Sequence, residues 1–263
     1  MSKFGSTIYV TKNSTEANKT PWRCVAITLD PEGTRYQKFL ANNRHLQIES
    51  FKGIKGSDLS KKEIIKQGLA TRELTYSPFL GNGTIGCAAS HKAIWDKAAE
   101  GKQGYVVLED DCYTHPKIAN FIDKKLITLM KIDICFFGIN TDSILQCISQ
   151  TGLARLSLFE PRYPSPEWIK KALSRTDTKT VELHKLMKAF GNCAYFISPK
   201  GARKLSTKLF PMSFRTTNIP LVTEKMPAIG LDRAGNGIYS KLEAYVCQPF
   251  LAYTPNIDSS TRP

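Results

Sequence analysis

The stretch GTIGCAASHKAIWDKAAEGKQGYVVLEDD (residues 83–111) decides the fold class, because its pattern joins a helix directly to a buried strand. Small residues open it, an apolar stripe at helical spacing follows, and Gly101 ends the predicted helix. The uninterrupted apolar run 105–108 has the length and composition of a buried strand. This strand ends in three consecutive carboxylates, which are Glu109, Asp110 and Asp111.

Similar helix and strand patterns lie on both sides of this stretch. Expected strands cover residues 24–29, 46–54, 105–108, 133–139, 192–198 and 242–253, and expected helices cover 34–43, 57–70, 86–100, 117–130 and 198–210. Strands that alternate with helices predict an α/β fold, with a mostly parallel sheet flanked by helices. We expect one domain over residues 1–263, with residues 1–22 as an N-terminal extension. Residues 8–10 are a candidate edge strand, and 214–230 are expected to be mostly loop.

Residues 140–188 break this alternation and form a basic insertion rich in Pro, Arg, Lys and Ser. They are expected to be a long connection or a small helical insertion, and such segments often carry function. Residues 140–210 contain 12 Lys and Arg against 5 Asp and Glu, a net +7 and half of the charge of the chain. We expect side chains that bind a second substrate or partner here, namely Arg155, Arg162, Lys170, Lys171 and Arg175.

The composition is that of a soluble globular protein with an unusual charge. The net charge of +14 and the pI near 9.4 favour a polyanionic partner or a pocket for an anionic nucleotide. No apolar run of about 18 residues occurs, and the N-terminus has no signal-peptide pattern, so a cytoplasmic location is expected. Seven scattered cysteines without a C-x-x-C spacing predict buried reduced thiols rather than a structural zinc site.

The acidic strand end has the chemistry of a metal site. Along a strand, residues two apart point to the same side, so Glu109 and Asp111 are expected to converge while Asp110 points away. Carboxylate and phosphate oxygens are the ligands that Mg²⁺ and Mn²⁺ prefer. A cation that bridges a diphosphate neutralises the charge of a departing nucleotide. The alternative is a solvated loop that leads into a helix cap.

The wider pattern resembles the signature of glycosyltransferase family 25, which includes lipooligosaccharide and collagen galactosyltransferases. The motif G-x-x-G-C-x-x-S-H-x-x-x-W of that family is met by Gly83, Gly86, Cys87, Ser90, His91 and Trp95. The run VVLEDD follows at the family's spacing. Residues 24–39, 51–60, 192–205 and 231–253 are similar to further family segments, in the family's order. Thr84-Ile85 replace the family's acidic residue before Gly-Cys, and residues 140–188 match no segment of the family pattern.

This resemblance implies a GT-A type fold, a nucleotide-sugar donor that is usually UDP-linked, a Mn²⁺ or Mg²⁺ ion, and inversion at the anomeric carbon. Inversion requires a carboxylate that removes the proton of the acceptor hydroxyl. Asp232 is the first candidate for this base and Asp110 the second, with a plain helix N-cap as the structural alternative for Asp232. The expected donor-binding residues are Thr28, Leu29, Asp30, Arg35, Arg72, Ser90, His91 and Glu109.

Three hypotheses for the partner remain open at this point. The favoured acceptor is a bacterial lipooligosaccharide or another surface glycan. The second is a hydroxymethylated base in phage DNA, which the enzyme would flip out while the insertion contacts phosphates in the host cytoplasm. The third, from another class, is a non-catalytic basic module that binds nucleic acid. The sequence fixes neither the sugar, the linkage nor the oligomeric state.

Overall fold

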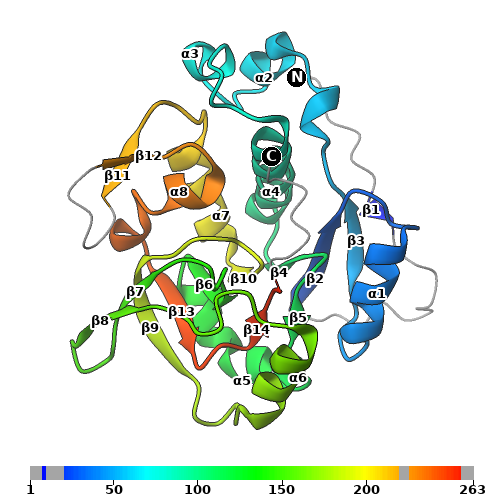
Figure 1. Ribbon diagram of the computed structural model, residues 1–263, viewed down its shortest axis with the longest axis vertical. Coiled ribbons are helices and arrows are strands. Elements are labelled where there is room, and N and C mark those ends of the chain that lie inside the picture. Colours follow the sequence, from blue (N-terminus) through cyan, green and yellow to red (C-terminus); the bar gives the residue numbers. More distant parts are fainter. Residues whose placement is uncertain (1–7, 10–20, 219–224, 256–263) are drawn as a thin grey trace.

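The computed structural model describes residues 8–9, 21–218 and 225–255, and its centre is a ten-stranded sheet (Figure 1). In spatial order the strands are β1 (Ile8–Tyr9), β3 (Glu49–Lys52), β2 (Trp22–Thr28), β4 (Gly104–Glu109), β10 (Ala194–Ile197), β6 (Ile134–Gly138), β13 (Ala244–Gln248), β9 (Glu182–Lys188), β7 (Leu145–Ile148) and β8 (Ala154–Ser157). Strands β3, β2 and β4 run parallel to one another, and β6 runs parallel to β13. Strand β10 lies between these two groups and is antiparallel to both β4 and β6. The expected α/β class is confirmed, and the sheet is mixed.

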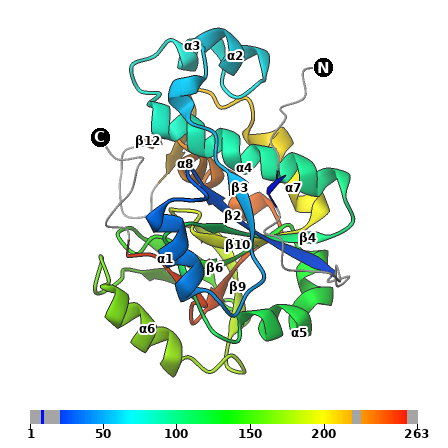
Figure 2. The same cartoon turned by 90° about the vertical axis from the view of Figure 1, so that its right-hand side faces the viewer.

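Helices cover both faces of this sheet. They are α1 (Thr34–Asn42), α2 (Lys61–Lys66), α3 (Arg72–Thr75), α4 (Asn82–Glu100), α5 (Ile118–Lys131), α6 (Pro166–Arg175), α7 (Pro199–Leu209) and α8 (Leu231–Gly235), with 3-10 turns η1 (Gly56–Asp58) and η2 (Tyr239–Lys241). Figure 2 shows α4 and α7 on one side of the sheet and α1 and α5 on the other. Two short strand pairs lie outside it, β11 (Thr216–Asn218) with β12 (Lys225–Pro227) and β5 (Tyr113–Thr114) with β14 (Ala252–Tyr253).

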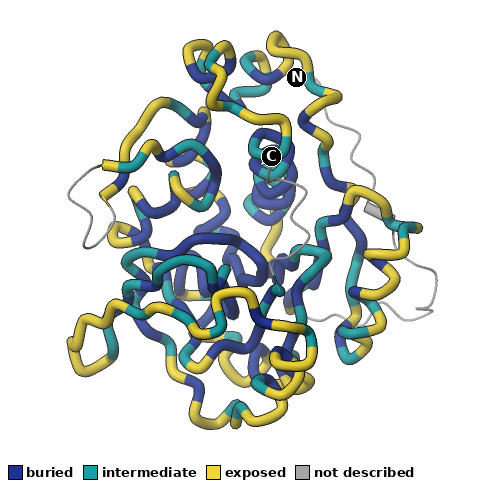
Figure 3. Tube along the Cα trace, viewed as in Figure 1, coloured by how far each residue is buried: buried dark blue, intermediate teal, exposed yellow. Residues whose placement is uncertain are grey.

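The core divides into two clusters because strand residues alternate between the faces. In β4, Val107 packs with the cluster under α4 and α7, whereas Val106 and Leu108 pack with the cluster under α1 and α5. Figure 3 shows that the buried residues follow the sheet and α4, and that the exposed ones lie on the outer loops and helices. Burial on both faces explains why β4 reads as an uninterrupted apolar run rather than an alternating one.

Helix α4 begins at Asn82, four residues earlier than its apolar pattern predicts. Its first turns contain two glycines, which normally disfavour a helix interior. Gly86 is needed there because a Cβ atom at this position would lie 2.5 Å from the Ile54 carbonyl oxygen. The helix therefore packs against the backbone that follows β3, and this tertiary contact outweighs the low helix propensity of glycine.

The prediction for residues 140–188 needs correction. In place of a long connection or a helical insertion, the segment supplies three strands of the main sheet, β7, β8 and β9, together with α6. Strand β9 is half-buried: His184 and Leu186 are buried, Glu182 is exposed, and the remaining residues are intermediate. Such partial burial is typical of an antiparallel sheet with one solvated face, and it leaves no continuous apolar run in the sequence.

The other predicted elements are present with shifted ends. Helix α2 has the expected capping box, in which the Ser60 hydroxyl accepts from the Glu63 amide and the Glu63 carboxylate accepts from the Ser60 amide. Residues 214–230 contain the β11–β12 pair, and the last expected strand is divided into β13 and β14 after Gln248. Most of the 1–22 extension falls outside the described residues.

Two predictions from composition can also be compared with the structure. All seven cysteines are free, and six of them are buried, which confirms reduced thiols in the core. Among the helices of the described ranges, none combines the length and apolar character that crossing a bilayer requires.

Candidate active site

The acidic end of β4 lies beside the end of β2, since Ile27 is the register partner of Glu109. Glu109 is the last residue of the strand, and a turn follows in which the Cys112 amide donates to the Glu109 carbonyl over 3.1 Å. Asp110 and Asp111 therefore belong to the turn, where the two-residue alternation of a strand no longer applies.

The prediction that Asp110 points away is wrong for this reason. The Arg35 guanidinium from α1 contacts both aspartates, with Nε 2.7 Å from Asp110 Oδ1 and Nη2 3.2 Å from Asp111 Oδ2. Glu109 faces the opposite neighbour, helix α4, where His91 Nε2 lies 3.5 Å from its Oε1. The three carboxylates thus share one small region, with a guanidinium on one side and an imidazole on the other.

Asp111 carries the strongest electrostatic signal in this region. Burial and, after it, the negative charge of Glu109 raise its pKa to about 7, although Arg35 acts in the opposite direction. Its Oδ1 is buried and has no hydrogen-bond partner among the described residues. A buried carboxylate oxygen without a partner is costly, and a hard divalent cation would satisfy it. The residues present therefore fit a metal site formed by Asp111 and Glu109.

The end of β2 forms a tight turn next to these carboxylates. Thr28 is buried, and its carbonyl accepts from the Gly53 amide over 2.7 Å. Leu29 and Asp30 are exposed, and Asp30 Oδ1 accepts from the Glu32 amide over 3.1 Å. The carboxyl ends of parallel strands are the usual place for a nucleotide in an α/β sheet. The structure thus brings these three expected donor contacts beside the metal-site residues.

Asp232 approaches the same region from the other half of the molecule. It is partly buried in the first turn of α8, where Oδ1 accepts from the Arg233 amide over 2.7 Å and Oδ2 accepts from the Gly191 amide over 3.3 Å. Burial raises the pKa of Asp232, these two amides oppose the rise, and the charge of Glu109 adds to it. The N-cap of α8 is Gly230, so the alternative of Asp232 as a plain N-cap is not what is observed.

The two expected donor contacts on α4 differ in their surroundings. The Ser90 hydroxyl accepts from the Ile54 amide over 2.8 Å and donates to the Gly86 carbonyl over 2.7 Å, so it joins α4 to the segment after β3. His91 has only 1% of its surface exposed and faces Glu109. Contact of either side chain with a donor stays a prediction, and for Ser90 it requires a hydroxyl that already has two partners.

Arg72 is not joined to this region. It lies on α3, where its guanidinium stacks over Tyr76 with 5.7 Å between the guanidinium carbon and the ring centroid. Figure 1 places α3 at the upper end of the molecule, away from β5 and β14. No hydrogen bond or ion pair within the described ranges connects it to the acidic end of β4.

The five expected acceptor residues do not form one group. Lys170, Lys171 and Arg175 lie on α6, which packs against β5 directly after Asp111, and the Lys170 ammonium lies 5.9 Å from the Tyr113 ring centroid. Arg162 donates to the Asp142 carbonyl over 2.9 Å, and Arg155 is exposed on the edge strand β8. Figure 1 shows β8 and α6 on different sides of the molecule. The α6 group lies beside β5, which follows the acidic end.

Comparison with known proteins identifies the chain at this point. Residues 27–217 match the family described as glycosyltransferase family 25 (LPS biosynthesis protein), which is more than half of the sequence. This chain belongs to glycosyltransferase family 25. The enzyme is a glycosyltransferase, which agrees with the first two hypotheses rather than with a non-catalytic basic module. A search of curated proteins finds no match to the sequence.

In this glycosyltransferase, several residues of the site escaped the sequence analysis. Cys87 has its thiol near His91 and Glu109, with one ligand atom from each of the three within 4.8 Å of the others, and burial raises its pKa. The spacing of Cys87 and His91, four residues apart on one helix, is the signal that places them on one face. Tyr195 contacts His91 across 104 residues, and no local pattern indicates that contact.

Proposed function

We propose that this family 25 glycosyltransferase moves a sugar from a UDP-sugar to a hydroxyl of a bacterial lipooligosaccharide or related surface glycan, with inversion and with Mn²⁺ or Mg²⁺. One observation carries the proposal: a buried carboxylate oxygen of Asp111 that has no hydrogen-bond partner among the described residues, near Glu109 at the end of a central strand. This arrangement is better explained as a site for a cation and a diphosphate than as a purely structural loop.

The donor half of the site follows from the charges around it. Asp111 and Glu109 would hold the cation, which supplies charge neutralisation for the departing nucleoside diphosphate. Arg35 contacts Asp111 Oδ2 over 3.2 Å, and this positive charge favours the ionised carboxylate that a cation requires. The turn at Thr28–Asp30 lies beside these groups, at the carboxyl end of β2, where the nucleoside would bind.

Inversion is a single in-line displacement at the anomeric carbon. The acceptor oxygen forms a bond to that carbon as the bond to the phosphate oxygen breaks, and the hydroxyl proton goes to a carboxylate. Asp232 is the better candidate, because its pKa is raised by burial and a general base benefits from a raised pKa. Asp110 is less suited, since the Arg35 guanidinium already occupies its Oδ1 at 2.7 Å.

The acceptor is assigned from the family description and from the position of α6. Helix α6 packs against β5 and carries three basic residues, Lys170, Lys171 and Arg175. Their positive charges would bind the phosphates of a lipooligosaccharide core. The net charge of +14 also favours the second candidate, a hydroxymethylated base in DNA. Binding of duplex DNA that weakens steeply between low and high salt, together with transfer to that DNA, would favour the second candidate over the first.

The proposal is tested by UDP release from UDP-sugars with and without Mn²⁺. Asp111→Asn keeps the shape of the side chain and removes the charge, so we expect at least a hundredfold loss of Mn²⁺-dependent turnover. Asp58→Asn, an exposed aspartate on η1, is the matched control and should retain normal turnover. Full activity of Asp111→Asn, or activity that is unchanged in EDTA, would contradict the metal assignment.

A further inference from the structure

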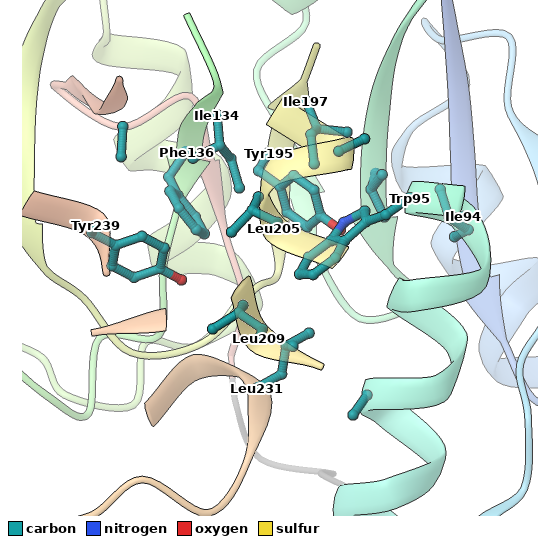
Figure 4. Packing of buried hydrophobic residues seen from close by; sticks show 14 of the residues in the cluster. Ile94, Trp95, Ile134, Phe136, Tyr195, Ile197, Leu205, Leu209, Leu231 and Tyr239 are labelled. Carbon is teal, nitrogen blue, oxygen red and sulfur yellow. The ribbon is translucent and has the colours of Figure 1, made fainter. Parts of the chain in front are cut away.

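Three buried rings connect the core under α4 to the acidic end of β4. Trp95 Nε1 lies 2.8 Å from the Tyr195 hydroxyl, and that hydroxyl lies 2.7 Å from His91 Nδ1. Each of the three residues has at most 2% of its surface exposed. Figure 4 shows the Tyr195 oxygen turned toward the indole nitrogen of Trp95. The other ring nitrogen of His91, Nε2, lies 3.5 Å from Glu109 Oε1.

The direction of these hydrogen bonds follows from what each group is able to donate. An indole N–H only donates, so Trp95 donates to the Tyr195 oxygen. The Tyr195 hydroxyl then has one proton to place, and within the described ranges the only remaining partner is His91 Nδ1. Leaving this proton without an acceptor in a fully buried position would cost about 1–3 kcal/mol. His91 Nδ1 is therefore the acceptor and carries no proton.

A neutral imidazole with a bare Nδ1 has its proton on Nε2. We infer that Trp95 and Tyr195 are positioning residues that fix this tautomer of His91, so that a preset Nε2–H is directed at the Glu109 carboxylate. His91 Nε2 is buried and makes no hydrogen bond to the described residues, because 3.5 Å to Glu109 is longer than an ordinary contact. Hydrogen bonds at unliganded active sites are often long and tighten when the ligands bind.

The consequence for the reaction rests on the proposed function, in which Glu109 holds the cation and the donor. A carboxylate that accepts a fixed N–H from one side presents its other oxygen to the cation in a defined direction. The core stack supports this geometry, since the His91 and Tyr195 ring centroids are 5.7 Å apart with 29° between the rings. The rings come from α4 and β10, so packing of these two elements sets the orientation of a side chain at the end of β4.

The same His91 nitrogen belongs to the Cys87–His91–Glu109 group, whose ligand atoms have the spacing of a transition-metal site. A metal on Nε2 needs the lone pair of that nitrogen, so the proton would have to move to Nδ1. His91 would then donate to Tyr195, whose own hydroxyl proton would lose its acceptor among the described residues. The direction of the hydrogen bonds from Trp95 to Tyr195 and from Tyr195 to His91 therefore favours a hydrogen-bond role for His91 over a metal-ligand role.

Nuclear magnetic resonance of the unliganded, ¹⁵N-histidine-labelled protein tests the tautomer without any assay of turnover. The protein has four histidines, and the His91 signal is assigned as the one lost in His91→Gln. We expect a neutral ring protonated on Nε2, and a shift of the tautomer ratio toward Nδ1–H in Tyr195→Phe. Tyr239→Phe is the matched control, because it deletes a buried hydroxyl from the same cluster, where Phe136 packs on both tyrosines, and it should leave the His91 signal unchanged.

The result that would overturn the inference is an Nδ1–H tautomer in the unaltered protein. A thiolate-to-metal absorption band on addition of Co²⁺ to the unliganded protein, abolished in Cys87→Ser, would also overturn it and would assign the group as a metal site. Both outcomes are independent of the glycosyltransferase assay. Failure of the proposed function is therefore distinguishable from failure of the inferred His91 tautomer.

Kinetics then test the positioning role. In Tyr195→Phe we expect the Mn²⁺ concentration for half-maximal activity to rise roughly tenfold, as is typical of residues that orient a metal ligand. The KM for the acceptor should not change. His91→Gln retains an N–H near the Nε2 position and should keep more activity than His91→Asn, which is too short to reach. Equal loss in these two variants, with unchanged Mn²⁺ dependence in Tyr195→Phe, would contradict the role.

Discussion

The acidic end of β4 and helix α6 of the basic insertion differ in how their charges are held. At the end of β4, Asp111 is largely buried between Arg35 of α1 and Thr254 after β14, and Glu109 faces His91 of α4. On α6, by contrast, Lys170 and Lys171 are exposed, with no ion pair to a described carboxylate. The difference teaches that the proposed donor side is built from groups held by neighbouring elements, whereas the proposed acceptor side presents solvent-exposed charges suited to a polyanion.

The largest effect on catalysis is expected at Asp232, which lies in the first turn of α8. Asp232→Asn removes the proposed base and keeps the size of the side chain. Loss of general-base catalysis lowers kcat by roughly 10²–10⁴-fold, with donor binding retained. Turnover and Mn²⁺ affinity are measured for Asp232→Asn and, for comparison, for Asp110→Asn. A larger loss of kcat in Asp110→Asn than in Asp232→Asn would move the base to the acidic end of β4.

The pH profile examines the same residue without a mutation. The pKa of Asp232 is raised by burial, and a general base must be unprotonated, so kcat should rise with pH through a value above the ordinary aspartate pKa of about 3.9. Below this raised pKa the base is protonated and activity falls. The profile is recorded at saturating donor, Mn²⁺ and acceptor. A kcat that stays constant from pH 4 to 8 would argue against a base with a raised pKa.

The rigidity of the donor side is tested at Gly86. A Cβ atom there would lie 2.5 Å from the Ile54 oxygen and 2.8 Å from the Gly56 nitrogen, both of which are backbone atoms. Gly86→Ala should lower the free energy of unfolding by about 1–3 kcal/mol, because the helix must move away from this backbone. Gly101→Ala is the control, since its nearest neighbour lies at 3.7 Å. Urea denaturation measures both, and equal stability of the two variants would show that α4 tolerates displacement.

A smaller effect is expected from the charges of α6. The double substitution Lys170→Ala and Lys171→Ala should raise the acceptor KM several-fold and weaken its dependence on salt, while donor hydrolysis stays normal. Lys124→Ala with Lys125→Ala on α5 removes the same charge from another exposed helical pair and serves as the control. Equal changes in the two double variants would show that only the overall charge attracts the acceptor.

The smallest effect is expected from Arg155 on the edge strand β8. Its side chain is exposed, and Figure 1 shows β8 on a different side of the molecule from α6. Arg155→Ala should change neither the acceptor KM nor, beyond about 0.5 kcal/mol, the free energy of unfolding. A several-fold rise of the acceptor KM in this variant would extend the acceptor site along the whole insertion and remove the contrast between its two ends.

Local patterns in the sequence determined the elements that form the centre of the site. The apolar run of β4, its acidic end, the Ser60–Glu63 capping box and the helix that carries Ser90 and His91 all follow from neighbouring residues. This succeeds because periodicity, caps and turns are set by interactions within a few positions along the chain. The family signature lies in the same continuous stretch.

Only the tertiary structure decided which of these residues meet. Strand β10 enters between β4 and β6 and brings Tyr195 to His91, and the order of the sheet brings Arg35 to Asp110, 75 positions away. The strands within 140–188 were also missed, because β9 is half-buried and mixes polar with apolar residues, so it lacks a clear apolar run. Contacts between distant segments depend on strand order and packing, which no short stretch of sequence specifies. The residue types of the site could therefore be predicted from local sequence, whereas their arrangement in space could not.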